Sequence, residues 1–212
     1  MTEFVFYSKS ADKKPGLGVA ENLEEAHDFT ELQSIPHWRR TLSNMSISPF
    51  YLGGIKYNSV EHFFHAAKFM KDYPEFAATF AMNGNMPWSD DPFIAKQAGK
   101  AGRLSSKGKR YKNKKIPELN DFKHEKMRPD FYDKIDEKAM TLALYSKFSQ
   151  NIEAARILLL TGNAKLYHLI TVRGRKSIKQ RWYHLERVRN CIIKYPPVVF
   201  NAETIDKVLG NK

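Results

Sequence analysis

Three side chains with catalytic potential follow one another at helical spacing near residue 60. Glu61, His65 and Lys68 are separated by four and then three residues, so they fall along one line of an α-helix. A carboxylate, an imidazole and an amine in a row can transfer protons or stabilise positive charge at a reacting carbon. The competing interpretation is that Glu61 does no more than cap its helix.

Lys147 is a further lysine whose setting favours chemistry. It lies on the apolar stripe of a second predicted helix, and burial there would lower the pKa of its amine. The structural alternative is a lysine that packs its stem against the core and extends its amine to water. Lys147 is therefore of interest if its helix lines a pocket.

Other chemistries have no motif to support them. His62 and His65 lie beside Glu61, but their spacing is not the His-Glu-x-x-His of zinc proteases. Cys191 is the single cysteine, which rules out an intramolecular disulfide and a Cys-rich zinc module. The sequence has no nucleophile elbow, Walker loop or dinucleotide fingerprint. We expect neither a metal nor a cofactor.

A hairpin is predicted just before the helix that carries these three side chains. Residues 50–52 and 55–57 alternate around Gly53-Gly54, which is typical of a tight hairpin turn. Asn58 is the expected N-cap of the helix that follows, with Glu61 completing a capping-box pattern. The apolar stripe of this helix consists of Val60, Phe63, Phe64, Ala67 and Met70.

Helical patterns also dominate the rest of the chain. We predict a strand at 4–7, a loop at 82–92, helices at about 136–150 and 152–161, and a further helix near 182–192. Gly162 is a suitable residue to end the second of these helices. The sequence thus indicates a mainly α fold with a few short β-strands (α+β). We expect a single domain over 1–212, with a polar insert at about 10–40 and a basic loop at about 96–115.

The charge is strongly positive and unevenly placed. The chain has 35 Lys and Arg against 23 Asp and Glu, a net charge of +12. Residues 96–115 hold nine basic side chains and no acid, and residues 173–194 hold eight with one acid. The second stretch also contains Trp182, Tyr183 and His184, which suits stacking on bases beside phosphate contacts. The alternative is that both are solvated surface segments, but the pattern favours a polyanionic partner such as nucleic acid.

The same composition argues against a membrane protein. No apolar run approaches the roughly 20 residues needed to cross a bilayer, and Glu3 stands where a signal peptide has basic residues. A single cysteine fits a reducing compartment. We expect a cytoplasmic protein without membrane contact.

A series of motifs follows a fixed order along the chain. They are Leu42-Ser43-Asn44 with Pro49-Phe50, the run from Tyr57 to Phe69, Asp91-Pro92, Ala95-Lys96, Gly102-Arg103, Met140 to Leu160 with Lys147-Phe148-Ser149-Gln150-Asn151, and Thr161 to Leu166. In this order and spacing they resemble the motifs of the NADAR (YbiA-like) family, and the resemblance covers about Phe4 to Arg189.

The resemblance implies a mostly helical domain with N-glycosidase activity. Members of the family are described as cleaving N-glycosidic bonds in phosphorylated early riboflavin intermediates, or as removing ADP-ribose from guanine. Glu61 matches the helix-borne glutamate of the family and would stabilise charge at the anomeric carbon or activate water. Alternatively, Lys68 or Lys147 would attack that carbon and form a ring-opened Schiff base.

The leaving base needs an aromatic stacking partner, which in the family is a Trp before the second large helix. The Arg-Pro-Asp context here selects Phe131, whereas the spacing to Met140 selects Tyr132, which we prefer. The full set of expected substrate-binding residues is Ser43, Asn44, His65, Phe69, Trp88, Arg103, Asp130, Tyr132 and Arg173.

Two departures from the family bear on the substrate. Riboflavin-type members carry an Asp and a Trp-Gly-x-Gly motif after the Thr-Gly turn, where this chain has residues 167–170 and then Arg173-Gly174-Arg175-Lys176. These cations favour a substrate with more phosphate, so ADP-ribosylated guanine, in DNA or in a nucleotide, is the preferred substrate. The alternatives are the riboflavin intermediates and a non-catalytic module that binds nucleic acid or ADP-ribose. The other departure is the insert at 10–40, to which we assign no function.

Overall fold

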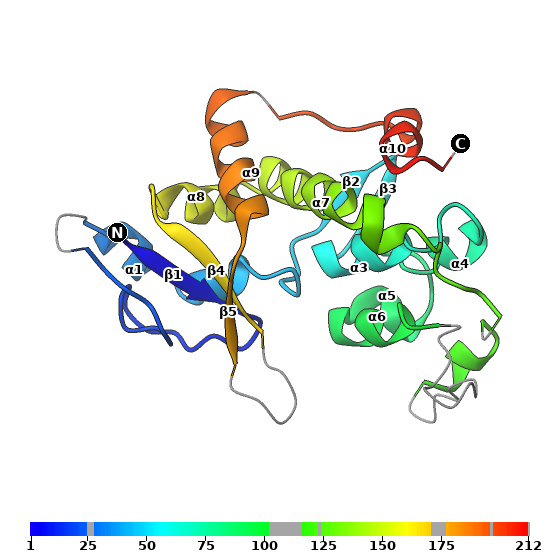
Figure 1. Ribbon diagram of the computed structural model, residues 1–212, viewed down its shortest axis with the longest axis horizontal. Helices are drawn as coiled ribbons and strands as arrows, with labels where there is room; N and C mark the ends of the chain where they lie inside the picture. Colours follow the sequence, from blue (N-terminus) through cyan, green and yellow to red (C-terminus); the bar gives the residue numbers. More distant parts are fainter. Residues whose placement is uncertain (25–27, 102–115, 123, 171–176, 196, 212) are drawn as a thin grey trace. The chain divides into compact units, whose positions relative to one another are not determined.

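Helices dominate the described part of the chain, with short strands in two small sheets (Figure 1). The computed structural model describes residues 1–24, 28–101, 116–122, 124–170, 177–195 and 197–211. The α+β class predicted from the sequence is confirmed. The backbone contacts divide the chain into two units, which we describe one at a time: Met1–Ser48 with Lys147–Val198 (unit 1), and Pro49–Ser146 with Val199–Lys212 (unit 2). A single domain over 1–212 stays a prediction.

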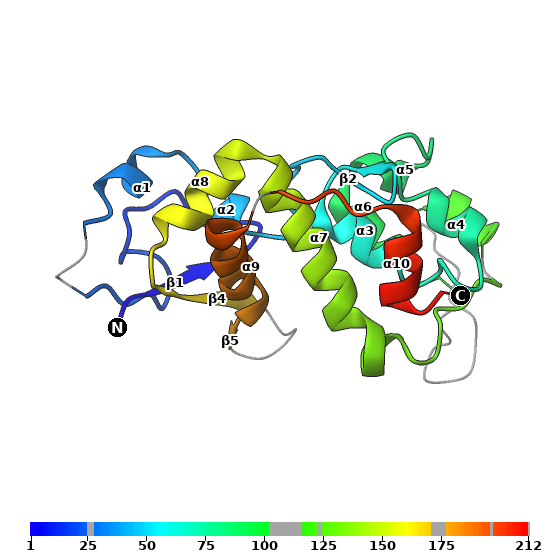
Figure 2. The ribbon, with the colours of Figure 1, turned by 90° about the horizontal axis from the view of Figure 1, so that it is seen from above.

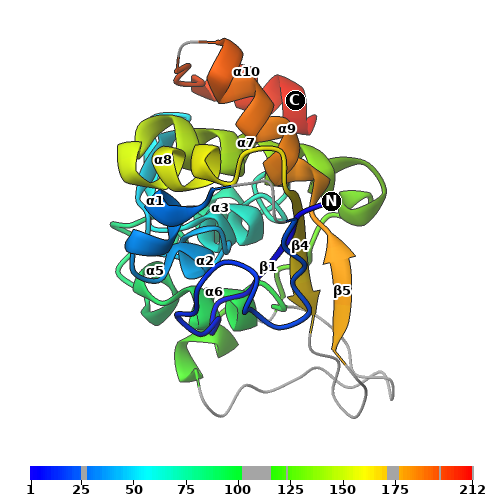
Figure 3. The same cartoon turned by 90° about the vertical axis from the view of Figure 1, so that its left-hand side faces the viewer.

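Unit 1 is built on a three-stranded sheet. Strand β1 (Glu3–Phe6) pairs in parallel with β4 (Lys165–Ile170), which pairs antiparallel with β5 (Ile178–Arg181), so β4 lies in the middle (Figure 3). The residues from Phe4 to Phe6 are all buried, which explains their unbroken apolar run. The sequence predicted β1 but neither β4 nor β5.

The helices of unit 1 are α1 (Thr30–Ser34), α2 (Trp38–Thr41), α8 (Ile152–Leu160) and α9 (Tyr183–Lys194). Helices α8 and α9 confirm the predicted helices at 152–161 and 182–192. The chain leaves α8 through Gly162, whose φ is +55°, a left-handed conformation that glycine adopts without steric cost.

A buried ion pair organises the insert at 10–40. The Glu21 carboxylate lies 2.6 Å from the Arg39 guanidinium, and the two side chains are 0% and 3% exposed. Glu21 also accepts backbone N–H bonds from Val5, Gly16 and Gly18. A side chain at Gly18 would overlap this carboxylate, since an added Cβ would lie 2.4 Å from its carbon. The pair therefore fastens the insert to β1.

Unit 2 opens with the predicted hairpin. Strands β2 (Phe50–Leu52) and β3 (Ile55–Tyr57) pair antiparallel. Gly53 and Gly54 have φ values of +66° and +79°, and positive φ at both positions gives the turn its compatible twist.

Short helices follow the hairpin, and α3, α5 and α6 lie side by side (Figures 1 and 2). The helical elements of unit 2 are α3 (Val60–Ala66), α4 (Pro74–Ala78), α5 (Pro87–Asp90), α6 (Pro92–Ala98), the 3₁₀ turn η1 (Pro117–Asn120), the π-helical turn η2 (Phe131–Ile135), α7 (Asp136–Gln150) and α10 (Ala202–Leu209). Helix α7 has the predicted bounds, and its last turn, from Lys147, belongs to unit 1.

The predicted cap of α3 is wrong. Ser59 occupies the N-cap position and makes no capping bond with its side chain. Asn58 instead donates from Nδ2 to the Ser89 carbonyl, at 2.9 Å. Glu61 bonds to His65 rather than turning back to a cap, so the simple capping role weighed from the sequence does not hold.

The segment around Trp88 contains helix α5 rather than only a loop. The Trp88 ring packs with Phe76, Phe80 and Phe122, and Phe69 joins the cluster through Phe76 and Phe80. Trp88 and Phe69 are fully buried. Both residues were expected to bind substrate, and the structure places them in this aromatic core.

No helix among the described residues has the length and apolar character needed to cross a membrane.

Changing Glu21 to Gln tests whether the buried ion pair with Arg39 stabilises the insert. E21Q leaves the Arg39 cation buried without its counter-ion, so we expect the free energy of unfolding to fall by about 3–5 kcal/mol. Urea unfolding measures the loss. The matched control is E31Q, which breaks an exposed pair with Arg156 and should leave the unfolding midpoint nearly unchanged. Equal midpoints for the two variants would contradict the assignment.

Candidate functional site

A buried carboxylate and a buried imidazole form the centre of the site in unit 2. Helix α3 carries Glu61 and His65 one turn apart, and His65 Nε2 lies 3.1 Å from Glu61 Oε1. Glu61 is 7% exposed and His65 is 5% exposed. The spacing in the sequence correctly placed these two residues on one line of the helix.

Helix α6 brings a cation to the same carboxylate. Lys96 Nζ lies 3.8 Å from Glu61 Oε1, and the Lys96 side chain is 52% exposed. The sequence did not single out Lys96 as a site residue. Asp91-Pro92 signals only the start of α6, because Asp91 caps the helix by accepting bonds from the backbone of Phe93 and Ile94, and Pro is favoured at the first helical position.

The charge state of the pair follows from its surroundings. Burial is the largest influence on Glu61 and would raise its pKa, but the interactions with His65, Lys96 and Lys68 outweigh it and hold the pKa below its ordinary value. Burial lowers the pKa of both His62 and His65 to about 4. At neutral pH Glu61 is therefore ionised, His65 is neutral, and the Nε2–H of His65 donates to the carboxylate.

A glycine makes room for the His65 ring. A Cβ added at Gly99, just after α6, would lie 2.0 Å from His65 Nδ1 and 2.4 Å from Cγ. Any side chain at residue 99 would therefore displace the ring. Among the described residues Nδ1 has no hydrogen-bond partner and is buried.

Lys68 lies among aromatic rings just beyond α3. Its Nζ donates to the Tyr132 hydroxyl at 3.1 Å and lies 5.2 to 5.6 Å from the ring centres of Phe64, Phe131 and Tyr132. These distances permit cation–π attraction. Lys68 is only 2% exposed.

The exposure of the two rings separates the alternatives for the stacking residue. Phe131 is fully buried, whereas Tyr132 is 49% exposed. A base can reach the face of an exposed ring only, so the geometry favours Tyr132, the residue preferred from the sequence.

Asp130 belongs to a group of hydrogen bonds, centred on Arg128, that holds the C-terminal helix α10. Both of its oxygens accept bonds from Arg128, at 2.7 and 3.0 Å, and this pairing lowers the pKa of Asp130. Arg128 also donates to the Leu209 carbonyl at 2.7 Å, at the end of α10, and its backbone N–H bonds the Lys68 carbonyl. Asp130 was expected to bind substrate, and its carboxylate here orients Arg128.

Lys147 is in unit 1 with the first family-like motif. Its side chain is fully buried, and Nζ donates to the carbonyls of Thr41 at 2.6 Å and Ser43 at 3.0 Å. Burial lowers the pKa of Lys147 to about 7. Ser43 is buried and Asn44 is half-buried. The structure thus brings Lys147 and Ser43 together in unit 1, and Glu61, His65, Lys68 and Tyr132 together in unit 2. Arg103 and Arg173 lie outside the described residues.

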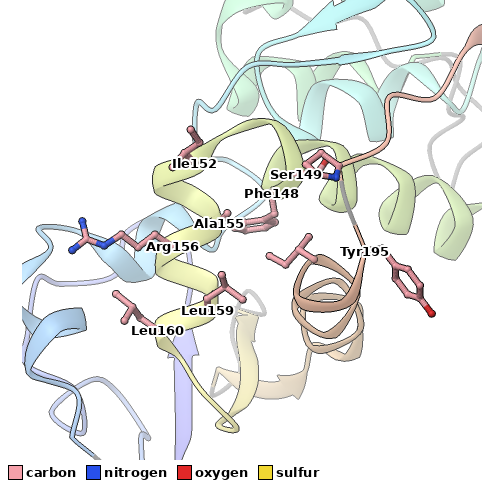
Figure 4. A pocket seen from close by; sticks show the side chains of 10 residues that line it. Phe148, Ser149, Ile152, Ala155, Arg156, Leu159, Leu160 and Tyr195 are labelled. Atoms are coloured by element: carbon pink, nitrogen blue, oxygen red, sulfur yellow. The ribbon is translucent and has the colours of Figure 1, made fainter.

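Unit 1 also has an apolar groove of about 490 Å³ between α8 and α9. Side chains of Phe148 and Leu159 line it together with Ile192 of α9, and Arg156 points away from it (Figure 4). The residues that line this groove include no carboxylate or imidazole, so it lacks groups for the chemistry considered above.

No group of three or more His, Cys, Asp and Glu side chains within the described ranges is arranged to hold a metal ion.

The hairpin, the helices and the two small sheets together define a YbiA-like α+β fold. The solved structure to which the chain is similar is the NMR structure of the E. coli protein YbiA. The TM-score is 0.50 at 20% sequence identity, and the match covers 73% of this chain and 79% of that chain. At this identity the likeness establishes the fold. No family model matches the sequence, and no curated protein matches it.

The pH dependence of stability tests the environment of Lys147. Between pH of about 7 and 10.5 the unfolded chain holds a proton that the folded chain lacks, so this lysine makes stability rise with pH over that window. We expect the free energy of unfolding of the wild type to rise relative to K147M by up to about 1.4 kcal/mol per pH unit.

Urea unfolding at several pH values measures this difference. The control is K138M, an exposed lysine on the same helix, which should keep the pH dependence of the wild type. Parallel curves for K147M and the wild type would show that Lys147 keeps an ordinary pKa.

Proposed function

We propose that the protein is an N-glycosidase that hydrolyses a ribosyl C–N bond and removes ADP-ribose from guanine, in DNA or in a nucleotide. The observation that carries the proposal is an ionised, buried carboxylate, Glu61, with two lysines acting on it in the same unit. The NADAR resemblance supplies the reaction class, and the YbiA-like fold supports it at the level of architecture.

The carboxylate suits the charge that develops during this reaction. Breaking a ribosyl C–N bond builds positive charge at the anomeric carbon, and a fixed negative group in a water-poor site stabilises it strongly. Water attacks that carbon and passes a proton to Glu61, while the electrons of the broken bond go to the guanine nitrogen. The same proton is then returned to that nitrogen, which leaves Glu61 ionised again. Glu61 is thus the proposed base and charge stabiliser.

A lysine route remains as the alternative mechanism. The Lys68 amine would bond to the anomeric carbon as the bond to guanine breaks, ring opening would give a Schiff base, and water would release the sugar. Its burial among aromatic rings fits an amine held away from water. Lys147 is the other amine considered, but it donates to two backbone carbonyls of unit 1. Borohydride reduction followed by mass spectrometry separates the lysine route from the water route.

The remaining groups fit the binding of base and phosphate. The exposed ring of Tyr132 offers a stacking face, and the half-exposed Lys96 offers a cation close to Glu61. Arg103 and Arg173, in the two basic segments, stay predicted phosphate ligands.

Replacing Glu61 by Gln tests the proposal directly. E61Q keeps the shape of the side chain but removes its charge, so we expect the release of ADP-ribose from an ADP-ribosylated guanine oligonucleotide to fall at least roughly 100-fold. Chromatography of the released ADP-ribose gives the rate. E75Q, at an exposed glutamate of α4, is the control and should keep full activity.

The same assay separates the alternatives. Loss of a phosphorylated aminopyrimidine substrate, without release from guanine, would favour the riboflavin-type reaction. Binding with a steep salt dependence and no turnover would favour a binding module. Undiminished release by E61Q would contradict the mechanism.

Two substitutions at Tyr132 test the stacking role. Y132A removes the ring and with it the stacking of the base, which contributes about 1–3 kcal/mol to binding. We therefore expect KM to rise roughly 5- to 150-fold. Y132F keeps the ring and loses only the bond to Lys68, so its KM should stay near that of the wild type. Steady-state kinetics on the same oligonucleotide decide the matter, and an unchanged KM for Y132A would exclude stacking.

A further inference from the structure

We propose that His65 is a positioning residue: it acts through Glu61, by holding Oε1 of the carboxylate so that Oε2 faces the attacking water, and it does not contact the substrate. This inference rests on the proposed function. It replaces the expectation from the sequence that His65 binds substrate.

The contacts of the carboxylate support an oriented Glu61. His65 Nε2 lies 3.1 Å from Oε1, and Lys96 Nζ lies 3.8 Å from the same atom. Among the described residues, Oε1 thus makes both of the polar contacts of the carboxylate. A carboxylate held by one oxygen presents the other in a fixed direction, which is what a base that receives a proton from water requires.

Neither ring nitrogen of His65 is accessible to a ligand. Nε2 donates to Glu61, and Nδ1 is buried against Gly99, where even a Cβ would not fit. The ring is 5% exposed. A ligand therefore has no nitrogen of His65 to bind, and the burial that keeps the ring neutral at neutral pH also excludes an imidazolium acid.

Gly99 is the second part of this arrangement. The ring occupies the space of a missing side chain, at 2.0 Å from the position of an added Cβ. The φ of Gly99 is −61°, which any residue adopts, so the requirement for glycine is steric. Two features at α6 therefore support the carboxylate. Gly99, just after the helix, leaves room for the His65 ring that donates to Glu61, and Lys96 contributes a positive charge.

The charged and titratable groups that act on Glu61 come from α3, from the turn after it and from α6. They are His65 and Lys68 from α3 and the turn after it, and Lys96 from α6, with His62 coupled to Glu61 on α3. Removing His65 leaves the two lysines in place. The pKa of Glu61 should then rise toward its ordinary value without reaching that of an isolated buried carboxyl.

The test compares H65L, H65Q and G99A with the wild type over a range of pH. H65L removes the donor, so we expect kcat to fall roughly 10- to 100-fold, KM to stay constant, and the acid limb of the pH profile to move to higher pH. H65Q keeps an N–H donor and should recover most of the kcat. G99A should behave like H65L, because it displaces the ring without altering it. A raised KM with an unchanged acid limb would overturn the proposal by placing His65 on the substrate.

A titration of the free protein separates this inference from the proposed function. The ¹³C signal of the Glu61 carboxyl, followed by NMR against pH, reports its pKa without any substrate. A higher pKa in H65L and G99A than in the wild type and H65Q supports the positioning role, even if the wild type releases nothing from any substrate. Equal pKa values in all four proteins would overturn it. The CD spectra check that each variant is folded.

Discussion

The structure of the candidate site depends on keeping one carboxylate ionised in a place that water scarcely reaches. Burial alone would favour the protonated form of Glu61. A hydrogen bond from the same helix and cations from two segments reverse that preference. The identity of the residues around Glu61 follows from this requirement: a neutral donor one turn away, a lysine on α6, and a glycine that lets the donor approach.

Buried charges have a second use in this chain, which is to fasten irregular segments. Glu21 and Arg39 hold the insert against β1. Arg128 holds the end of α10, and Arg189 of α9 donates to Thr161 and Ala164 around the Gly162 turn. Each of these side chains satisfies backbone groups of a loop or a helix end that would otherwise be buried without partners. The positive charge of the chain is thus partly structural, and it does not all serve a polyanionic partner.

Local patterns in the sequence predicted part of this arrangement. The hairpin, α7 and α8 follow from glycine placement and helical periodicity, and the spacing of Glu61 and His65 puts them in contact without help from the rest of the fold. Lys96 and Gly99 could not be found in the same way, because their contacts with α3 depend on how α6 packs against it. Strand β4 was missed for a similar reason, because it pairs with β1, which is far away in the sequence. The cap of α3 was misassigned because Asn58 finds a tertiary partner at Ser89.

A π-helical turn contains both Phe131 and Tyr132, the two residues between which the sequence left the choice of stacking ring open. The Arg-Pro-Asp context lies before the π-helical turn η2, and Met140 lies after it, on α7. A π-turn bonds residue i to i+5 and so contains one residue more than an α-turn. The segment between Asp130 and α7 therefore holds one residue more in this turn than an α-helical turn would hold. The same turn leaves Phe131 buried against Phe64 and Tyr132 exposed beside Lys68. π-turns are rare and recur at functional sites, so the exposed ring of Tyr132 beside Lys68 is consistent with the stacking role proposed for it.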